Sequence, residues 1–379
     1  MKKISILALS LATALSGFAQ ANVVKDAERA LKGASPDFKA IRTMIKPALS
    51  NPETKGNATA WYVAGMTEFK TYDDLYGKKA IGKSVDNKAM GHAIIDGYNY
   101  FITAFPLDTV VNEKGKVKTK YSKEMAKTIG AHANDFDNAA RMLYEAKDFD
   151  GAYNAWGIFL DLPHIASLGK DAPAAQPDTV ASELRFYQAL AAWQGDRLED
   201  ALNTMLKAKA QGYNDKQLYD YAISLAAQLQ HNDTVYTLAE EAIPLYGKED
   251  SKYISLVING YIEKKDYATA QNMLEKAIAN DPNNAQLFDA LGILYESQKG
   301  DDKEANAALD QKAYDNYKKA VDVDANFARG NFDLARKLSD KAFVISDGAS
   351  SLSQAEYNKV KDFPPFPRGC CLFRKSLSA

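Results

Sequence analysis

Apolar residues recur every three or four positions through most of the chain, in short runs that polar turns interrupt. The stretch Ser251–Val323 shows this most clearly, with runs that begin at Tyr253, Tyr267 and Leu287 and turn-forming residues between them. This spacing is typical of amphipathic helices. Each pair of short helices has an apolar stripe that it cannot bury alone, so the pattern predicts hairpins that stack on one another.

Looser copies of the same hairpin are expected before and after this stretch. They cover residues 57–104, 136–162, 184–210 and 218–246, and another begins at Ala328. Residues 22–56 are predicted to form a helical cap, and residues 57–360 the repeat array. Three connecting segments break the pattern: we expect an insertion at 76–87, a polar loop at 112–120 and an exposed linker at 164–178.

Two consecutive units carry the residue pattern of a known repeat family. Counted from Ser251 and from Ala285, the matching positions are Tyr261, Ala270, Leu274, Ala277 and Pro282, then Leu291, Gly292, Tyr295, Tyr317 and Ala320. The two starts lie about 34 residues apart, and small residues stand where helices cross closely. The stretch resembles the tetratricopeptide repeat (TPR). The resemblance implies an all-α fold, a right-handed superhelical solenoid of helix-turn-helix repeats whose first helices line a concave groove.

The second of these units departs from the family spacing. Its second helix arrives late, because Gly300–Asp310 adds residues to the unit. Two interpretations stay open at this point. The extra residues lengthen the helices, or they form a lip beside the groove.

The N-terminus has the three parts of a secretory signal peptide. It starts with the basic Met1–Lys3, continues with the apolar and uncharged Ile4–Leu15, and reaches small residues at Ala19 and Ala21. The apolar run is too short to span a bilayer. Residues 1–21 are therefore expected to be removed after Ala21. We expect the mature chain to be periplasmic or secreted, of an exported bacterial type, without a transmembrane segment.

Composition excludes several classes of function. The 379 residues are 25% charged with a formal net charge of −2, which gives no basic footprint for nucleic acid. No nucleotide-binding or hydrolase motif occurs. The histidines have no metal-site spacing to each other or to cysteine: His92, His132, His164 and His231. We expect no catalytic residue, no cofactor and no metal, hence a protein that is not an enzyme.

Function is then expected in the groove that the family resemblance implies. The first helices would present seven polar residues to it: Lys252, Asn259, Glu263, Gln286, Asp289, Glu296 and Arg336. Such a groove suits an extended peptide or a helix of a partner protein. A scaffold for protein–protein interaction in the bacterial envelope is expected. The alternative is a glycan- or cell-wall-fragment-binding protein that stacks sugars on Trp61, Trp156 and Trp193.

Residues 361–379 do not follow the repeat pattern. This tail holds a proline-rich run that cannot continue a helix, and it holds the chain's two cysteines, Cys370 and Cys371. Adjacent cysteines do not meet ordinary disulfide geometry, so the fold is expected to need no disulfide. Two interpretations stay open: a disordered tail, or the product of a truncation or a reading-frame change.

Overall fold

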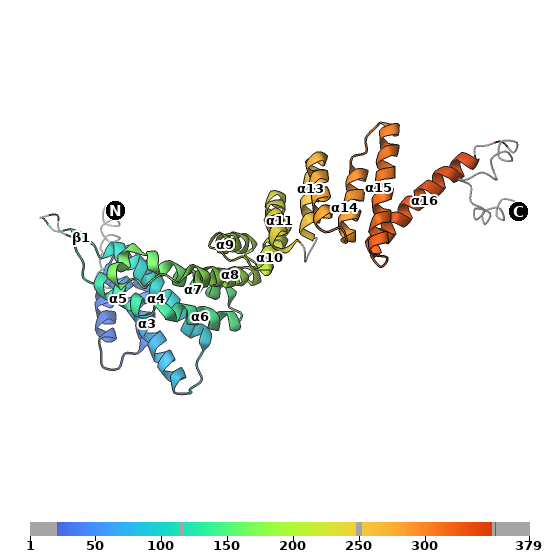
Figure 1. Cartoon of the computed structure of the whole chain (residues 1–379). Coiled ribbons are helices and arrows are strands. Elements are labelled where there is room, and N and C mark those ends of the chain that lie inside the picture. Colours follow the sequence, from blue (N-terminus) through green and yellow to red (C-terminus); the bar gives the residue numbers. More distant parts are fainter. Residues whose placement is uncertain are drawn as a thin grey trace, which may run out of the picture. The chain divides into compact units, whose positions relative to one another are not determined.

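The computed structural model describes residues 21–350, apart from 112, 114, 116 and 248–251, together with residue 353. The predicted signal peptide, except its last residue Ala21, and the predicted tail at 361–379 lie outside these residues. The described chain is mostly helical (Figure 1) and divides into two units, Met1–Leu225 and Ala226–Ala379. One helix, α10 (Lys216–Gln228), carries the chain from the first unit into the second. In the described part, no helix combines the length and apolar character needed to cross a membrane.

The first unit consists of helices that pack in pairs. Residues 21–31 are helical, and they are followed by α2 (Phe38–Ser50), α3 (Ala58–Ala80), α4 (Asn87–Leu107), α5 (Ser122–Ala131), α6 (Ala133–Glu145), α7 (Phe149–Asp161), α8 (Asp178–Gln194) and α9 (Leu198–Ala210). Helix α3 packs on α4, α6 on α7, and α8 on α9. The stripes that these helices bury include Phe69, Phe101 and Phe136, each at most 1% exposed.

All three predicted connecting segments of this unit are more ordered than expected. The expected insertion at 76–87 is wrong in part, because α3 continues to Ala80 and α4 begins at Asn87; Tyr76 stacks on the buried Tyr72 with ring centroids 6.0 Å apart. The expected polar loop at 112–120 contains a short strand, β2 (Val117–Lys118), which pairs antiparallel with β1 (Val110–Val111) just before the loop. The register pairs Val110 with Lys118 and Val111 with Val117.

The expected exposed linker at 164–178 is also wrong in part. Two 3-10 turns occupy much of it, η1 (Leu162–His164) and η2 (Ala166–Asp171), and η2 packs on α5. Leu168 is only 2% exposed. One buried leucine among polar and small residues produces no periodic pattern, which is why the sequence predicted an exposed segment.

The second unit is a row of helical hairpins that runs from yellow to red in Figure 1. It contains α11 (Asn232–Tyr246), α12 (Lys252–Glu263), α13 (Tyr267–Asn280), α14 (Ala285–Ser297), α15 (Lys303–Val323) and α16 (Ala328–Ser350). Each helix contacts the next, and in addition α12 contacts α14 and α14 contacts α16. The first helices of successive hairpins therefore lie side by side as one layer, as in a solenoid.

The hairpin turns repeat one backbone conformation. Among the described residues, the non-glycine positions with positive φ are Lys147, Asp196, Gln230 and Lys265, at 57° to 60°. Each stands between the two helices of a hairpin. The N–H of the following residue reaches back to a carbonyl of the last helical turn, as from Asp266 to Tyr261 at 2.9 Å. This is the Schellman ending of a helix, and its recurrence shows that one structural unit is repeated.

The extra residues at Gly300–Asp310 lengthen a helix and form no separate lip. Helix α14 ends at Ser297, and α15 begins at Lys303, where the Asp302 side chain accepts hydrogen bonds from two backbone N–H groups. The Asn306 side chain closes the connecting turn on Gly300. The added length therefore belongs to the second helix of the hairpin alone.

Two glycines mark where helices approach most closely. A Cβ atom on Gly292 of α14 would lie 2.5 Å from the ring of Tyr317 in α15, and one on Gly260 of α12 would lie 2.6 Å from the ring of Tyr236 in α11. Any side chain at either position would push the aromatic ring out of its place in a close-packed interior. These contacts explain why small residues recur at such positions in the sequence.

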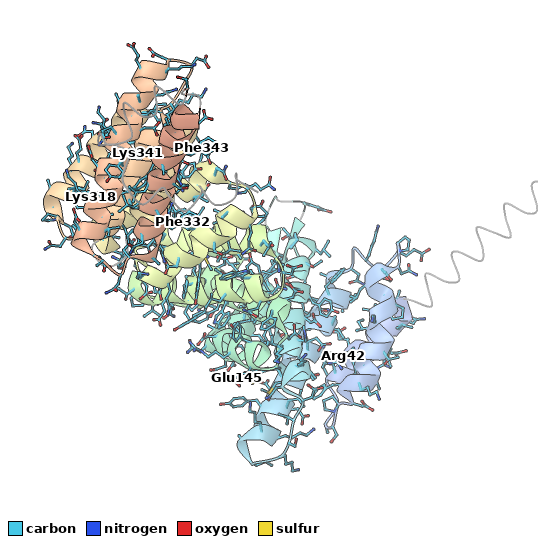
Figure 2. All side chains as sticks on the ribbon, turned by 90° about the vertical axis from the view of Figure 1, so that its right-hand side faces the viewer. Arg42, Glu145, Lys318, Phe332, Lys341 and Phe343 are labelled. Atoms are coloured by element: carbon cyan, nitrogen blue, oxygen red, sulfur yellow. The ribbon has the colours of Figure 1, made fainter. Side chains whose placement is uncertain are left out.

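Helix α16 buries only one of its faces. Asp333 and Lys337 on that face are at most 8% exposed, because α14 and α15 cover them. Phe332 and Phe343, labelled in Figure 2, are 67% and 71% exposed. The helix thus fixes its charged inner face against the preceding hairpin.

Candidate functional site

A hollow of about 240 Å³ opens in the second unit between the first helices of three hairpins. Residues of α12 and α14 and the start of α16 enclose it. Its lining is Ser255, Ile258, Asn259, Gln286, Asp289, Ala290, Ile293, Phe327 and Arg329. Three of the seven residues predicted for the groove, Asn259, Gln286 and Asp289, therefore meet in one place.

The hollow has a polar rim and apolar walls. Asn259 and Gln286 are exposed, and each offers an amide that can both donate and accept hydrogen bonds. Ile258 and Ala290 are buried and Ile293 is half-buried, so the walls below the rim are aliphatic. This arrangement fits a ligand group that has an apolar stem and hydrogen-bonding atoms on either side of it.

Asp289 lies in the lining with its carboxylate largely cut off from water, at 2% exposure. Its Oδ2 is 3.2 Å from Nε of Arg329, whereas its Oδ1 has no hydrogen-bond partner in the part of the chain that the structure describes. Burial raises the pKa of the Asp289 carboxyl, and the neighbouring Asp333 carboxylate raises it further, to about 6. An incompletely paired buried carboxylate costs folding free energy.

Two further predicted residues, Glu296 and Arg336, bind each other. Nη2 of Arg336 lies 2.6 Å from Oε2 of Glu296, and the Tyr317 hydroxyl donates to the same oxygen at 2.8 Å. Lys337 forms an additional ion pair with Glu296. Burial alone would raise the pKa of the Glu296 carboxyl, but these donors lower it to about 2. Both side chains lie outside the lining of the hollow and are engaged within the chain.

The last two predicted residues lie elsewhere on α12. The ammonium of Lys252 stands 5.1 Å from the ring centroid of its neighbour Tyr253. Glu263, at the C-terminal end of the helix, is exposed and hydrogen-bonds with Tyr236 of α11; burial and this bond raise the pKa of Tyr236 to about 12. Neither residue lines the hollow.

Sequence reasoning missed Phe327 and Arg329, which complete the hollow. Arg329 is the second residue of α16, as Gln286 is the second residue of α14. The repeat register that selected Gln286 would therefore have selected Arg329 as well. The repeat spacing thus pointed to Arg329, but the prediction for this helix named Arg336 instead.

The tryptophans of the glycan alternative are packed against neighbours. Trp156 is 3% exposed, donates its Nε1–H to Asp137 at 2.9 Å, and lies between the rings of Tyr144 and Tyr187. The half-buried Trp61 donates to the carbonyl of Lys55 at 2.7 Å. Trp156 therefore offers no open face for a sugar ring.

Solved structures that resemble this chain include two whose descriptions name TPR repeats. One is YrrB, described as a TPR protein with an unusual peptide-binding site, at 14% identity and a TM-score of 0.35, covering 56% of this chain and 97% of its own. Another similar structure is the MamA protein, at 16% identity and a TM-score of 0.35, covering 53% of this chain and 96% of its own. A third is the TPR domain of P58(IPK), at 12% identity and a TM-score of 0.28, covering 85% and 98%.

No family model and no curated protein sequence matches the chain. The evidence for its fold lies in its own geometry. It repeats one Schellman turn between paired helices, places glycines where helices cross, and sets successive first helices side by side. The described residues are therefore mainly paired helices, and those of the second unit form a solenoid of helical hairpins.

Proposed function

We propose that this chain is a non-enzymatic scaffold that binds a segment of a partner protein in the groove on α12, α14 and α16. One observation carries the proposal. Polar side chains from two consecutive first helices, Asn259 and Gln286 at the rim and Asp289 below, converge on a single hollow with aliphatic walls. A protein segment supplies the matching groups, because its main chain has both donors and acceptors at regular intervals.

Binding would use the rim and the walls for different purposes. The amides of Asn259 and Gln286 would hydrogen-bond to the main chain of the segment and set its direction. Ile258 and Ile293 would bury one of its side chains. Such a contact needs no covalent step and no bound metal.

Capture from an envelope extract tests this proposal. The immobilised mature chain is expected to retain a defined protein, and the double variant Asn259→Ala, Gln286→Ala is expected to retain at least tenfold less. Asn272→Ala, at an exposed position on α13, is the matched control and should bind as the unaltered chain does. Equal retention by the double variant, or retention of polysaccharide in place of protein, would contradict the proposal.

The proposal includes export to the bacterial envelope. Its support is the order of basic, apolar and small residues in positions 1–21. Cell fractionation followed by N-terminal sequencing should find the chain in the periplasm or the medium, starting at Asn22. A cytoplasmic chain that still begins at Met1 would contradict export and leave the groove proposal standing.

A further inference from the structure

We propose that the outer face of helix α16 binds the same face of a second copy of this chain, with the two helices antiparallel. The inference goes beyond the proposed function, because it concerns the association of the chain with itself. It holds or fails whatever the groove binds.

Helix α16 carries much of the exposed apolar surface of the described residues. Phe332 and Phe343, labelled in Figure 2, are 67% and 71% exposed, and Leu338 is 48% exposed. Of the nine large apolar side chains that are exposed in the described part of the chain, four belong to this helix. Apolar surface gathered in one place marks a contact with another molecule.

The preceding hairpin shows what such a face receives. Aligned at their first residues, α14 and α16 place Gly292 at the position of Ala335 and Tyr295 at that of Leu338. On α14 these positions are covered, since Tyr317 of α15 packs on Gly292 and Tyr295 is only 7% exposed. On α16 both are exposed. The outer face of α16 therefore has the pattern that takes another helix.

Five residues on this face follow the spacing of a coiled coil. Ala328, Phe332, Ala335, Ser339 and Ala342 succeed one another at intervals of four and three residues, and all are exposed. This alternation puts them on one side of the helix, and none of them is charged. We call these five residues the α16 seam.

The seam is complementary to itself when two copies pair antiparallel. In this arrangement Phe332 faces Ala342 of the second copy, and Ser339 faces its Ala335. The large side chain meets a small one, and the small residues between them allow the helices to approach closely. A parallel pair would set Phe332 against Phe332 and align the two helix dipoles unfavourably. The pattern therefore favours a second copy in the antiparallel direction.

The sequence that follows α16 does not supply an equivalent second helix. Pro364 and Pro365 would interrupt a helix that starts after Ser353 within about ten residues. The second helices α13 and α15 have 14 and 21 residues. Ten residues span about 15 Å of helix, whereas Phe332 lies about 27 Å from the last residue of α16. A second copy provides a helix of full length with the matching pattern.

Sedimentation equilibrium of the unaltered mature chain tests the inference. A reducing buffer prevents crosslinks through Cys370 and Cys371. One pair of helices is a small interface, so we expect a monomer–dimer equilibrium with a Kd on the order of 10 µM. A chain that stays monomeric at about twenty times that concentration would overturn the inference.

One substitution tests the face itself. Leu338 lies on the flank of the seam, next to Leu338 of the second copy in the antiparallel pair. Leu338→Lys places two ammonium groups there and should weaken the dimer at least tenfold. Leu245→Lys on α11 is the matched control, because Leu245 is 47% exposed, and it should dimerise as the unaltered chain does. Equal dimerisation of the two variants would refute the assignment to α16.

Mixing of variants tests whether the face meets its own copy. Leu338→Lys and Leu338→Glu should each dimerise weakly, and an equimolar mixture should recover the dimer because opposite charges then meet. No gain on mixing would contradict the two-fold contact.

Disulfide formation tests the direction of the pair. The background is Cys370→Ser, Cys371→Ser. A mixture of Phe332→Cys and Ala342→Cys should form a crosslinked dimer, whereas Phe332→Cys alone should not. The reverse result would contradict antiparallel pairing.

Discussion

The two halves of helix α14 place a carboxylate in opposite environments. Asp289 and Glu296 lie two turns apart on the same side of the helix. Glu296 is bound by Arg336, Lys337 and Tyr317, and its pKa is lowered to about 2. Among the described residues, Asp289 pairs with Arg329 and has a buried oxygen without a donor, and burial together with the neighbouring Asp333 raises its pKa to about 6. The chain completes one carboxylate with its own groups and leaves the other incomplete.

This difference separates a structural residue from a candidate binding residue. A buried carboxylate that the protein pairs fully holds neighbouring helices together, here α14, α15 and α16. A buried carboxylate that the protein pairs only in part destabilises the free chain. Such a local conflict is typical of a site that a ligand completes. The predictions below alter one half of α14 at a time.

Removal of the Glu296 charge should have the largest effect. In Glu296→Gln, Arg336 would keep only Asp333 and the buried Lys337 only Asp310 as anionic partners. Breaking a buried network in this way costs about 3 kcal/mol of unfolding free energy. Urea denaturation followed by circular dichroism measures it. Glu275→Gln, at an exposed position on α13, is the control and should change the free energy by less than about 0.5 kcal/mol. A similar small change in Glu296→Gln would show that the network does not hold the hairpins together.

A methyl group between the two carboxylates should have the next largest effect. In Gly292→Ala the new Cβ would collide with the Tyr317 ring, at 2.5 Å, and the ring is fully buried. Overpacking of this kind costs about 2 kcal/mol. A Cβ atom on Gly77 of α3 would meet no other atom within 4 Å, so Gly77→Ala should be neutral or stabilising. Thermal denaturation measures the melting temperature of both variants. Equal changes in melting temperature would contradict the close approach of α14 and α15 at Gly292.

The pH dependence of stability should have opposite signs in the two halves. Between its unfolded pKa near 3.8 and its folded pKa of about 6, Asp289 binds more proton in the folded state than in the unfolded state. Stability therefore rises as pH falls through this window, by about 1 kcal/mol between pH 7.5 and pH 5. Glu296 behaves in the reverse way. Its stabilisation is present above pH 4.5 and is lost as pH falls toward 2.

Comparison with Asp289→Asn isolates the first of these two effects. Denaturation curves at pH 7.5 and pH 5 should show the gain at low pH in the unaltered chain and a smaller gain, by about 1 kcal/mol, in the variant. The same gain in both proteins would mean that another group titrates in this range and that Asp289 is not strained by burial.

The fold could be predicted from the sequence wherever apolar residues recur at helical spacing. The hairpins from Tyr253 to Ala320 follow from helical spacing and from small residues such as Gly292, because those features directly reflect what must be buried. The length of α3 and the packed turn η2 were not accessible. Tyr76 is 54% exposed at the end of α3 and Leu168 is a single buried leucine in an irregular turn, so neither continues a periodic apolar stripe.

From the sequence, the candidate site could be predicted only as the face of the first helices that lines the groove. Asn259, Gln286 and Asp289 were selected because the family register turns them toward the groove, and they do meet. Glu296 and Arg336 were selected by the same rule. A register gives the direction of a side chain and says nothing of the distance between groups on different helices, so it could not reveal that these two neutralise each other.

Loss of the Tyr317 hydroxyl should have the smallest effect and sharpens the contrast most. In Tyr317→Phe the ring still packs on Gly292, and Glu296 keeps both Arg336 and Lys337, so only one hydrogen bond is lost. The expected cost is about 1 kcal/mol, and the pKa of Glu296 should rise from its value near 2. Affinity for the partner protein should stay the same, because the residues that line the hollow do not include Tyr317 or Glu296. NMR titration of the Glu296 carboxyl measures the first effect, and capture of the partner by the immobilised chain measures the second. A change in affinity would show that the halves of α14 are coupled, and the distinction between a structural and a binding carboxylate would then fail.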